Sequence, residues 1–166
     1  VMPERVDKLI LVDAAGYAFE SESVPLAFRI AATPGLSVLM RQLLPPGMVE
    51  KSVRSVYGDP ARVTPQLVQR YRDLALRAGN RHALATRMAQ HNTGREQDIR
   101  DLKIPTLILW GARDRLIPPA NGDRFAADIQ GSQLVVFPEL GHVPQEEDPA
   151  ATVAVVQKFL EQPRSN

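Results

Sequence analysis

Two short apolar runs, each followed by a polar turn, stand out in the last third of the chain. The first is Ile104–Trp110, before Gly111-Ala112-Arg113-Asp114, and the second is Leu134–Phe137, shortly before Gly141-His142. Apolar runs rich in branched residues and bounded by turn formers predict strands that are covered on both faces. A helical pattern over Asn121–Ile129 separates them, with Phe125, Ala126 and Ile129 on one face. Strand, helix and strand in this order predict a right-handed crossover and parallel strands.

Asp114 and His142 come directly after these two predicted strands. The carboxyl ends of parallel strands meet at one edge of a sheet, and ligands bind at that edge. We therefore expect the carboxylate and the imidazole to meet in space, although they are far apart in the sequence.

The beginning and the end of the chain carry one further strand and one further helix. Leu9–Val12 is a short apolar run that ends at Asp13, and it predicts a third strand. Asp148-Pro149 is a helix-starting pair, and the pattern after it predicts a final helix. We expect the inward face of that helix to carry Val153, Val156, Phe159 and Leu160.

From Tyr17 to about Gln97 the pattern is helical. Residues 25–32 and 36–44 are short apolar stretches, and a helix is predicted over Met48–Tyr57. Thr64-Pro65 predicts the start of another helix, which Gly79-Asn80 would end. The predicted stripe of that helix is Leu67, Val68, Tyr71, Leu74, Ala75 and Ala78, and a further helix carries Leu84, Ala85 and Met88.

Composition limits the classes of function. The 166 residues fit one domain, with 44% hydrophobic and 23% charged residues and a net charge of +1. This balance provides no electrostatic footprint for nucleic acid or for a lipid surface. No apolar run approaches the roughly 18 residues of a membrane span. We expect a cytoplasmic protein.

Metal and cofactor sites have little support in the sequence. The chain has no cysteine, which excludes disulfides and thiolate ligands. His82 and His91 have no second His, Asp or Glu at a recognisable ligand spacing, so we interpret both as solvated helix residues. We expect neither a metal nor a cofactor.

The motifs taken together resemble the C-terminal part of the α/β-hydrolases. The resemblance is carried by Pro3–Asp13, by the run Pro105–Asp114, by Gly141-His142 and by Asp148-Pro149 before a final helix. It implies an α/β fold with a short parallel sheet of about three strands, the sixth to eighth of the family. Residues 1–16 and 98–166 would form a partial core, and residues 17–97 would form an inserted helical cap that shapes the substrate pocket.

The same resemblance implies the roles of the two polar residues. In this family an acid follows the seventh strand and a histidine follows the eighth, in the order nucleophile, acid, histidine. Asp114 would then be the acid and His142 the general base of a Ser-His-Asp triad. Asp13 competes for the acid role, since it also ends a strand and some relatives place the acid after the sixth strand. Asp114 matches the Gly-x-x-Asp turn better.

A nucleophile elbow is missing from the chain. None of the serines lies in Gly-x-Ser-x-Gly, and Ser37, in Gly35-Leu36-Ser37-Val38-Leu39, lacks the second glycine and does not follow a strand. The elbow needs small residues because its backbone is strained and its helix packs closely on the strand. We therefore expect the elbow and the first five strands of the family to lie outside this chain, and the chain alone to be inactive.

Two classes of function remain open from the sequence. One is a hydrolase of a small molecule, either carboxylesterase-like or acting on a carbon–carbon bond; an aspartate at the elbow would make it a dehalogenase or an epoxide hydrolase. The other is a non-catalytic relative that binds a small apolar ligand. The strand Leu9–Val12 would expose an unpaired edge, so we expect the chain to associate with its own N-terminal portion or with a second copy.

Overall fold

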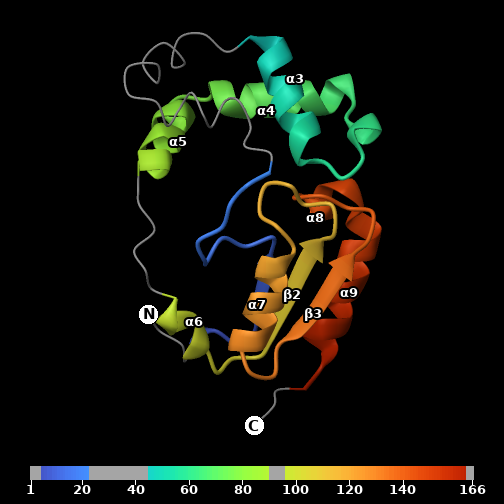
Figure 1. Cartoon of the computed structure of the whole chain (residues 1–166). Coiled ribbons are helices and arrows are strands. Elements are labelled where there is room, and N and C mark those ends of the chain that lie inside the picture. Colours follow the sequence, from blue (N-terminus) through green and yellow to red (C-terminus); the bar gives the residue numbers. More distant parts are fainter. Residues whose placement is uncertain (1–4, 23–44, 90–95, 164–166) are drawn as a thin grey trace.

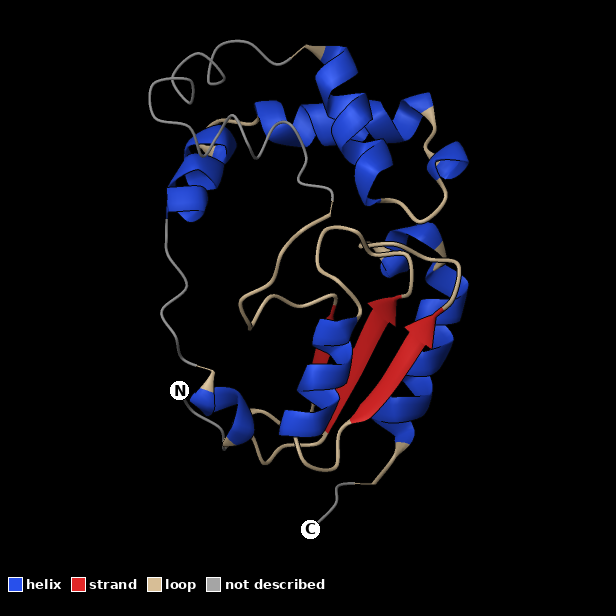
Figure 2. Ribbon diagram, viewed as in Figure 1, coloured by secondary structure: helices blue, strands red, loops and turns tan. Residues whose placement is uncertain are grey.

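The structure is a computed structural model, which describes residues 5–22, 45–89 and 96–163 (Figure 1). The stretches at 25–32 and 36–44, with Ser37, lie outside the described residues, and so does His91. In the described part, a parallel sheet has helices on both faces, and further helices lie beyond its carboxyl edge (Figure 2). None of these described helices combines the length and the apolar character that crossing a membrane requires.

The sheet contains β1 (Leu9–Val12), β2 (Thr106–Gly111) and β3 (Gln133–Phe137) in the order β1-β2-β3. Both pairings are parallel, as predicted, and Ile108 of the central strand lies beside Leu11 on one side and Leu134 on the other. Every residue of β2 is buried. The continuous apolar run therefore corresponds to a strand covered on both faces, and the predicted α/β class is confirmed.

The two faces of the sheet are covered by α7 (Ala120–Asp128) and α9 (Pro149–Glu161), which lie in front of the sheet and behind it in Figure 1. Side chains alternate along β2, so neighbouring residues enter different clusters. The cluster under α7 contains Ile108, Trp110, Ile117, Phe125 and Ile129. The cluster under α9 contains Leu107, Leu109, Phe137, Leu140 and Phe159.

A second group of helices, which we call the upper helices, lies beyond the carboxyl edge of the sheet (Figure 1). The group consists of α3 (Pro46–Val56), the 3₁₀ helix η2 (Pro60–Arg62), α4 (Pro65–Leu76) and α5 (Asn80–Ala89). Its core is built from Val49, Val53, Tyr57 and Val63. Thr64 caps α4 as predicted, because its side chain accepts a hydrogen bond from the Leu67 amide.

Two one-turn helices were not predicted. α6 (Gln97–Arg100) leads into β2, and α8 (Pro144–Glu147) directly follows the His142 turn. Segments of four residues are too short to show a helical period in the sequence, so tertiary contacts decide their conformation.

The predicted inward faces of two helices need correction. In α9, Phe159 is buried as predicted and Val156 packs against the core, but Val153 is 50% exposed and Leu160 is 53% exposed. Thr152, which was not predicted, is part of the buried face. In α4, Leu74 is 44% exposed, and the helix ends at Leu76 rather than at Gly79, so Ala78 lies beyond it and is exposed. In both helices the predicted apolar stripe is wider than the face that neighbouring elements bury.

The neighbours Phe159 and Leu160 provide a matched test of this core. We expect Phe159→Ala to lower the free energy of unfolding by about 3 to 5 kcal/mol, because it empties a position that is 2% exposed. Leu160→Ala should change it by less than about 0.5 kcal/mol. Urea unfolding followed by circular dichroism measures both; equal losses in the two variants would contradict this packing of α9.

Candidate active site

The carboxylate of Asp114 and the imidazole of His142 meet at the carboxyl edge of the sheet. His142 Nδ1 lies 2.8 Å from Asp114 Oδ2, which is the length of a charge-assisted hydrogen bond. The Asp114 side chain is fully buried, whereas the His142 side chain keeps 22% of its surface exposed. The structure therefore brings together the two residues that the sequence selected.

The turn after β2 fixes the direction of the Asp114 side chain. Asp114 Oδ1 accepts hydrogen bonds from the amides of Leu116 at 2.8 Å and Ile117 at 3.0 Å. An aspartate that bonds amides two and three residues ahead locks its own turn. With Oδ1 occupied in this way, Oδ2 remains for His142.

Backbone hydrogen bonds hold the Asp114 turn against the loop after β3. The Ala112 amide donates to the Phe137 carbonyl and the Arg113 amide donates to the Leu140 carbonyl, both at 2.9 Å. On the other side, the His142 amide donates to the carbonyl of Val56 at the end of α3, at 2.8 Å. The histidine loop is thus held between the sheet and the upper helices.

Asp13 is a third acid at this edge. Its backbone has a φ of 41°, in the left-handed region that non-glycine residues rarely adopt. Its Oδ1 accepts from the Gly111 amide at 2.9 Å, while its buried Oδ2 has no hydrogen-bond partner. Burial, opposed by the Gly111 hydrogen bond and reinforced by the charge of Asp114, raises the pKa of Asp13 to about 7.

The pKa of His142 results from opposing effects. Burial alone would lower it, but the hydrogen bond that His142 donates to Asp114, the charge of Asp114 and the charge of Asp13 together raise the pKa above its ordinary 6.5. A raised pKa means that the imidazole takes up a proton readily. The pair can therefore accept a proton from a bound hydroxyl group.

Comparison with known proteins gives the family. The sequence pattern described as the alpha/beta hydrolase family matches residues 2–155, which is most of the chain. The chain belongs to the alpha/beta hydrolase family. The fold class and the resemblance predicted from the sequence are thereby confirmed.

The similar proteins include some that are named as hydrolases. The chain is 30% identical over 165 residues to a 2-hydroxy-6-oxo-2,4-heptadienoate hydrolase of Pseudomonas putida, with 95% of this chain and 56% of that protein covered. It is also 30% identical over 174 residues to an uncharacterized protein of Mycobacterium tuberculosis, covering 96% of this chain and 50% of that protein. The chain thus spans about half the length of the curated relatives that it matches.

Solved structures of α/β-hydrolase proteins superpose on the chain as well. A meta-cleavage product hydrolase matches 96% of this chain and 58% of its own with a TM-score of 0.75 at 21% identity, which shows the fold alone. A thermophilic esterase from Thermogutta terrifontis matches 95% of this chain and 57% of its own, with a TM-score of 0.71 at 25% identity.

Asp13, Asp114 and His142 lie close enough together to hold a cation, judged by distance alone. One ligand atom from each of Asp13, Asp114 and His142 lies within 4.8 Å of the others, the single such group among the described residues. However, both oxygens of Asp114 already accept hydrogen bonds, and His142 Nδ1 is one of the partners. Among the described residues, this leaves Asp13 Oδ2 and His142 Nε2 without a hydrogen bond. Because Asp114 Oδ2 and His142 Nδ1 bind each other, the arrangement fits a hydrogen-bonded pair better than a metal site.

The remaining predicted residues lie away from this pair or outside the description. His82 is exposed on α5, as predicted, and Ser37 and His91 fall outside the described residues. A shallow groove of about 620 Å³ follows the side of α4 from Pro65 to Arg77, but neither Asp114 nor His142 lines it. We therefore assign no substrate to that groove.

Glu147, which was not predicted, is a buried acid whose side chain accepts a hydrogen bond from the backbone next to His142. The only signal for it was an acidic pair, Glu146-Glu147, ahead of the Asp148-Pro149 helix start. Acidic residues before a helix are ordinarily solvated, so composition alone could not separate the buried glutamate from its neighbour.

Replacement of Asp13 tests the buried acid. The unfolded chain releases this proton near pH 3.8 and the folded chain near pH 7, so the folded state binds more protons between these values. Stability contributed by this residue therefore falls as the pH rises through that window. We expect Asp13→Asn to stabilise the protein at pH 8 by on the order of 2 to 4 kcal/mol, and to have little effect near pH 4.

Thermal unfolding at several pH values measures this difference. Asp123→Asn is a suitable control, because Asp123 is exposed on α7. A stability gain from Asp13→Asn that is the same at pH 4 and pH 8 would show that the acid is ionised normally in the folded protein.

Proposed function

We propose that this chain supplies the acid and the general base of a Ser-His-Asp triad, with Asp114 as the acid and His142 as the base. The observation that carries the proposal is the 2.8 Å contact between His142 Nδ1 and the buried Asp114 Oδ2. This contact occupies one ring nitrogen and leaves Nε2 to meet a substrate or a nucleophile.

Formation of the acyl-enzyme takes two proton transfers, and attack of water on the acyl-enzyme repeats them to release the acid product and restore the serine. His142 Nε2 takes the proton of a serine hydroxyl as that oxygen attacks the substrate, and later donates it to the leaving group. Asp114 stays ionised, holds the tautomer with the proton on Nδ1, and stabilises the imidazolium that forms between the two steps. The raised pKa of His142 agrees with this role, because it reflects a stabilised imidazolium.

In our proposal, the nucleophile is not one of the 166 residues of this chain. In the described part of the chain no serine forms a hydrogen bond with His142, and the sequence contains no Gly-x-Ser-x-Gly. The oxyanion hole requires the amide after the nucleophile, so it would come from the same missing segment. The chain alone is accordingly inactive, and the complete enzyme contains it together with an elbow-bearing segment.

The relatives support a proposal about the substrate class. The Pseudomonas putida relative is a 2-hydroxy-6-oxo-2,4-heptadienoate hydrolase, and a relative from Burkholderia cepacia is a 2-hydroxy-6-oxo-6-phenylhexa-2,4-dienoate hydrolase. We propose that the complete enzyme hydrolyses a carbon–carbon bond in a small acid of this kind, or an ester. A non-catalytic ligand-binding role is the alternative, and a complete protein without a nucleophile at the elbow would favour it.

The helical region takes the role of a cap in this proposal. Residues 17–97 would form the cap, and residues 1–16 and 98–166 would belong to the catalytic core. The support comes from the position of the upper helices beyond the carboxyl edge of the sheet, where Asp114 and His142 meet (Figure 1). A cap in that position covers the site and shapes the pocket.

Substitution of the pair tests the catalytic proposal. In the complete enzyme, Asp114→Asn should lower kcat by about four powers of ten and His142→Ala should do so at least as strongly, with unchanged circular dichroism. Ester and dienoate hydrolysis would be measured for both variants beside His82→Ala, an exposed control. Undiminished turnover in the His142→Ala enzyme would refute the assignment.

The edge of β1 supports a further proposal about partners. Among the described residues β1 pairs only with β2, and all four of its residues are partly buried. An apolar strand with an unpaired edge is a template for another strand. We propose that the elbow-bearing segment of the same enzyme pairs there.

Light scattering on the purified 166-residue chain tests this pairing. We expect the chain by itself to self-associate, and to form a one-to-one complex with the elbow-bearing segment that recovers hydrolysis. A well-folded monomer that does not bind the added segment would contradict the proposal.

A further inference from the structure

A buried glutamate joins the upper helices to the histidine loop. Glu147 is 9% exposed, and each oxygen of its carboxylate accepts one backbone amide. Oε1 accepts from Gly141 at 2.7 Å and Oε2 accepts from Gly58 at 2.8 Å. Gly141 directly precedes His142, and Gly58 follows the end of α3. The Glu147 side chain therefore bonds both the histidine loop and the upper helices.

The two amides come close together because both residues lack a side chain. A β-carbon on Gly58 would lie 2.6 Å from the Gly141 nitrogen, closer than side-chain carbons approach other atoms. Since no side chain fits between them, the segments around Gly58 and Gly141 meet along their peptide groups. The amides would be buried without partners there if the carboxylate were absent, and that would cost stability.

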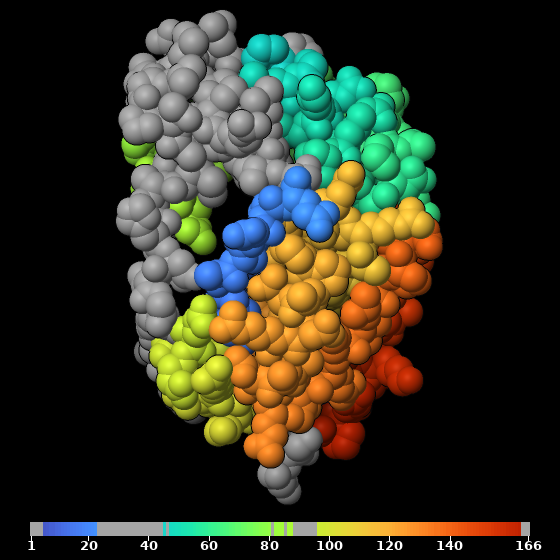
Figure 3. All heavy atoms as spheres, viewed as in Figure 1, coloured from blue at the N-terminus to red at the C-terminus, as the bar shows by residue number. Residues whose placement is uncertain are grey.

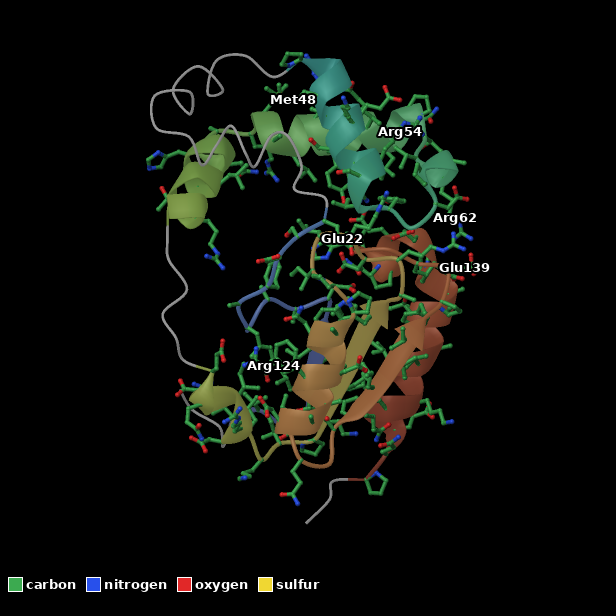
Figure 4. All side chains as sticks on the ribbon, in the orientation of Figure 1. Glu22, Met48, Arg54, Arg62, Arg124 and Glu139 are labelled. Carbon is green, nitrogen blue, oxygen red and sulfur yellow. The ribbon has the colours of Figure 1, made fainter. Side chains whose placement is uncertain are left out.

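Other contacts place His142 inside the same junction. The His142 amide donates to the Val56 carbonyl at 2.8 Å, two residues before Gly58. Arg62, labelled in Figure 4, donates from Nη1 to the backbone carbonyl of Glu147 at 3.0 Å. In the space-filling view the upper helices and the core are in direct contact on this side (Figure 3). The loop that carries the imidazole is therefore held from above by residues 56–62.

We propose that Glu147 is a positioning residue of the active site: by binding the Gly58 and Gly141 amides together, it sets where His142 stands opposite Asp114. The inference rests on the proposed triad. It also makes the 56–58 corner of the upper helices part of the fixed frame of the site, so that any opening of the cap takes place elsewhere.

The neighbouring Glu146 offers a matched control, because its carboxylate bonds side chains instead of the histidine loop. Glu146 Oε2 accepts from the hydroxyls of Tyr57 at 3.2 Å and Tyr71 at 3.0 Å, and pairs with Arg70 Nη2 at 2.7 Å. These bonds join α8 to α4 through Arg70 and Tyr71, and to the end of α3 through Tyr57. None of them involves Gly141 or His142. Loss of Glu146 should loosen the upper helices and leave the histidine in place.

The test compares Glu147→Gln and Glu146→Gln in the complete enzyme. Glutamine keeps the size of the side chain but turns a donor toward one of the two amides, so it breaks one of the two bonds. We expect Glu147→Gln to lower kcat by roughly tenfold to a hundredfold with a smaller change in KM, since misplaced catalytic groups cost rate. Glu146→Gln should change KM and keep kcat within about twofold.

The pH profile of kcat/KM separates positioning from a loss of stability. The ionisable groups that face His142 are Asp114 and Asp13, and the contact with Asp114 holds the histidine pKa above 6.5. If Glu147→Gln displaces the imidazole from Asp114, the acidic limb of the profile moves to lower pH. A variant that is only less stable keeps the limb in place.

Several outcomes are decisive. A Glu147→Gln enzyme with the kcat and acidic limb of the wild type overturns the inference, provided that His142→Ala is inactive; an active His142→Ala enzyme defeats the proposed triad instead. If Glu147→Gln does not fold, amide hydrogen exchange in the wild type decides. We expect the amides of Gly58 and Gly141 to be protected equally, and fast exchange at Gly58 alone would also overturn the inference.

Discussion

The hydrogen bond from His142 Nδ1 to Asp114 Oδ2 depends on two loops that leave different strands and must end side by side. The parallel register of β2 and β3 brings Gly111 opposite Phe137, so both loops start at the same height of the sheet. The amides of Ala112 and Arg113 then bind carbonyls of the second loop. Backbone bonds therefore bring the two loops together, and the side chains of Asp114 and Glu147 then fix the carboxylate and the histidine loop within them.

The site also contains features that work against stability. Asp13 has a left-handed backbone conformation and a buried oxygen without a hydrogen-bond partner. Strain and unpaired polar atoms gather at functional sites, where the surrounding structure supports them. Here the support is the Gly111 amide, which binds Asp13 Oδ1 at the end of the most buried strand. The proximity of Asp13 to the pair raises the pKa of His142, so the strained residue contributes to its basicity.

Much of the fold could be predicted from local pattern. The three strands, α7 and the cap of α4 at Thr64 follow from apolar runs and turn chemistry, and these are local signals. The convergence of Asp114 and His142 followed from one topological rule about parallel strands. Their catalytic roles remain a prediction.

The parts that could not be predicted depend on contacts between distant segments. Glu147 and Glu146 are adjacent and chemically identical, yet one bonds the backbone of the histidine loop and the other bonds tyrosine hydroxyls. The exposed side of α9, with Val153, depends on which face of the helix packs on the sheet, which the helix sequence does not reveal. The strain at Asp13 likewise depends on β2 rather than on its own neighbours.

The most direct measurement is an NMR titration of the imidazole of His142 in the 166-residue chain, assigned by loss of its signal in His142→Gln. We expect a pKa above 6.5 that falls in Asp114→Asn, because the hydrogen bond and the charge of Asp114 raise it against the effect of burial. A pKa at or below 6.5 that does not change when Asp114 is replaced would contradict the pairing on which the proposed function rests.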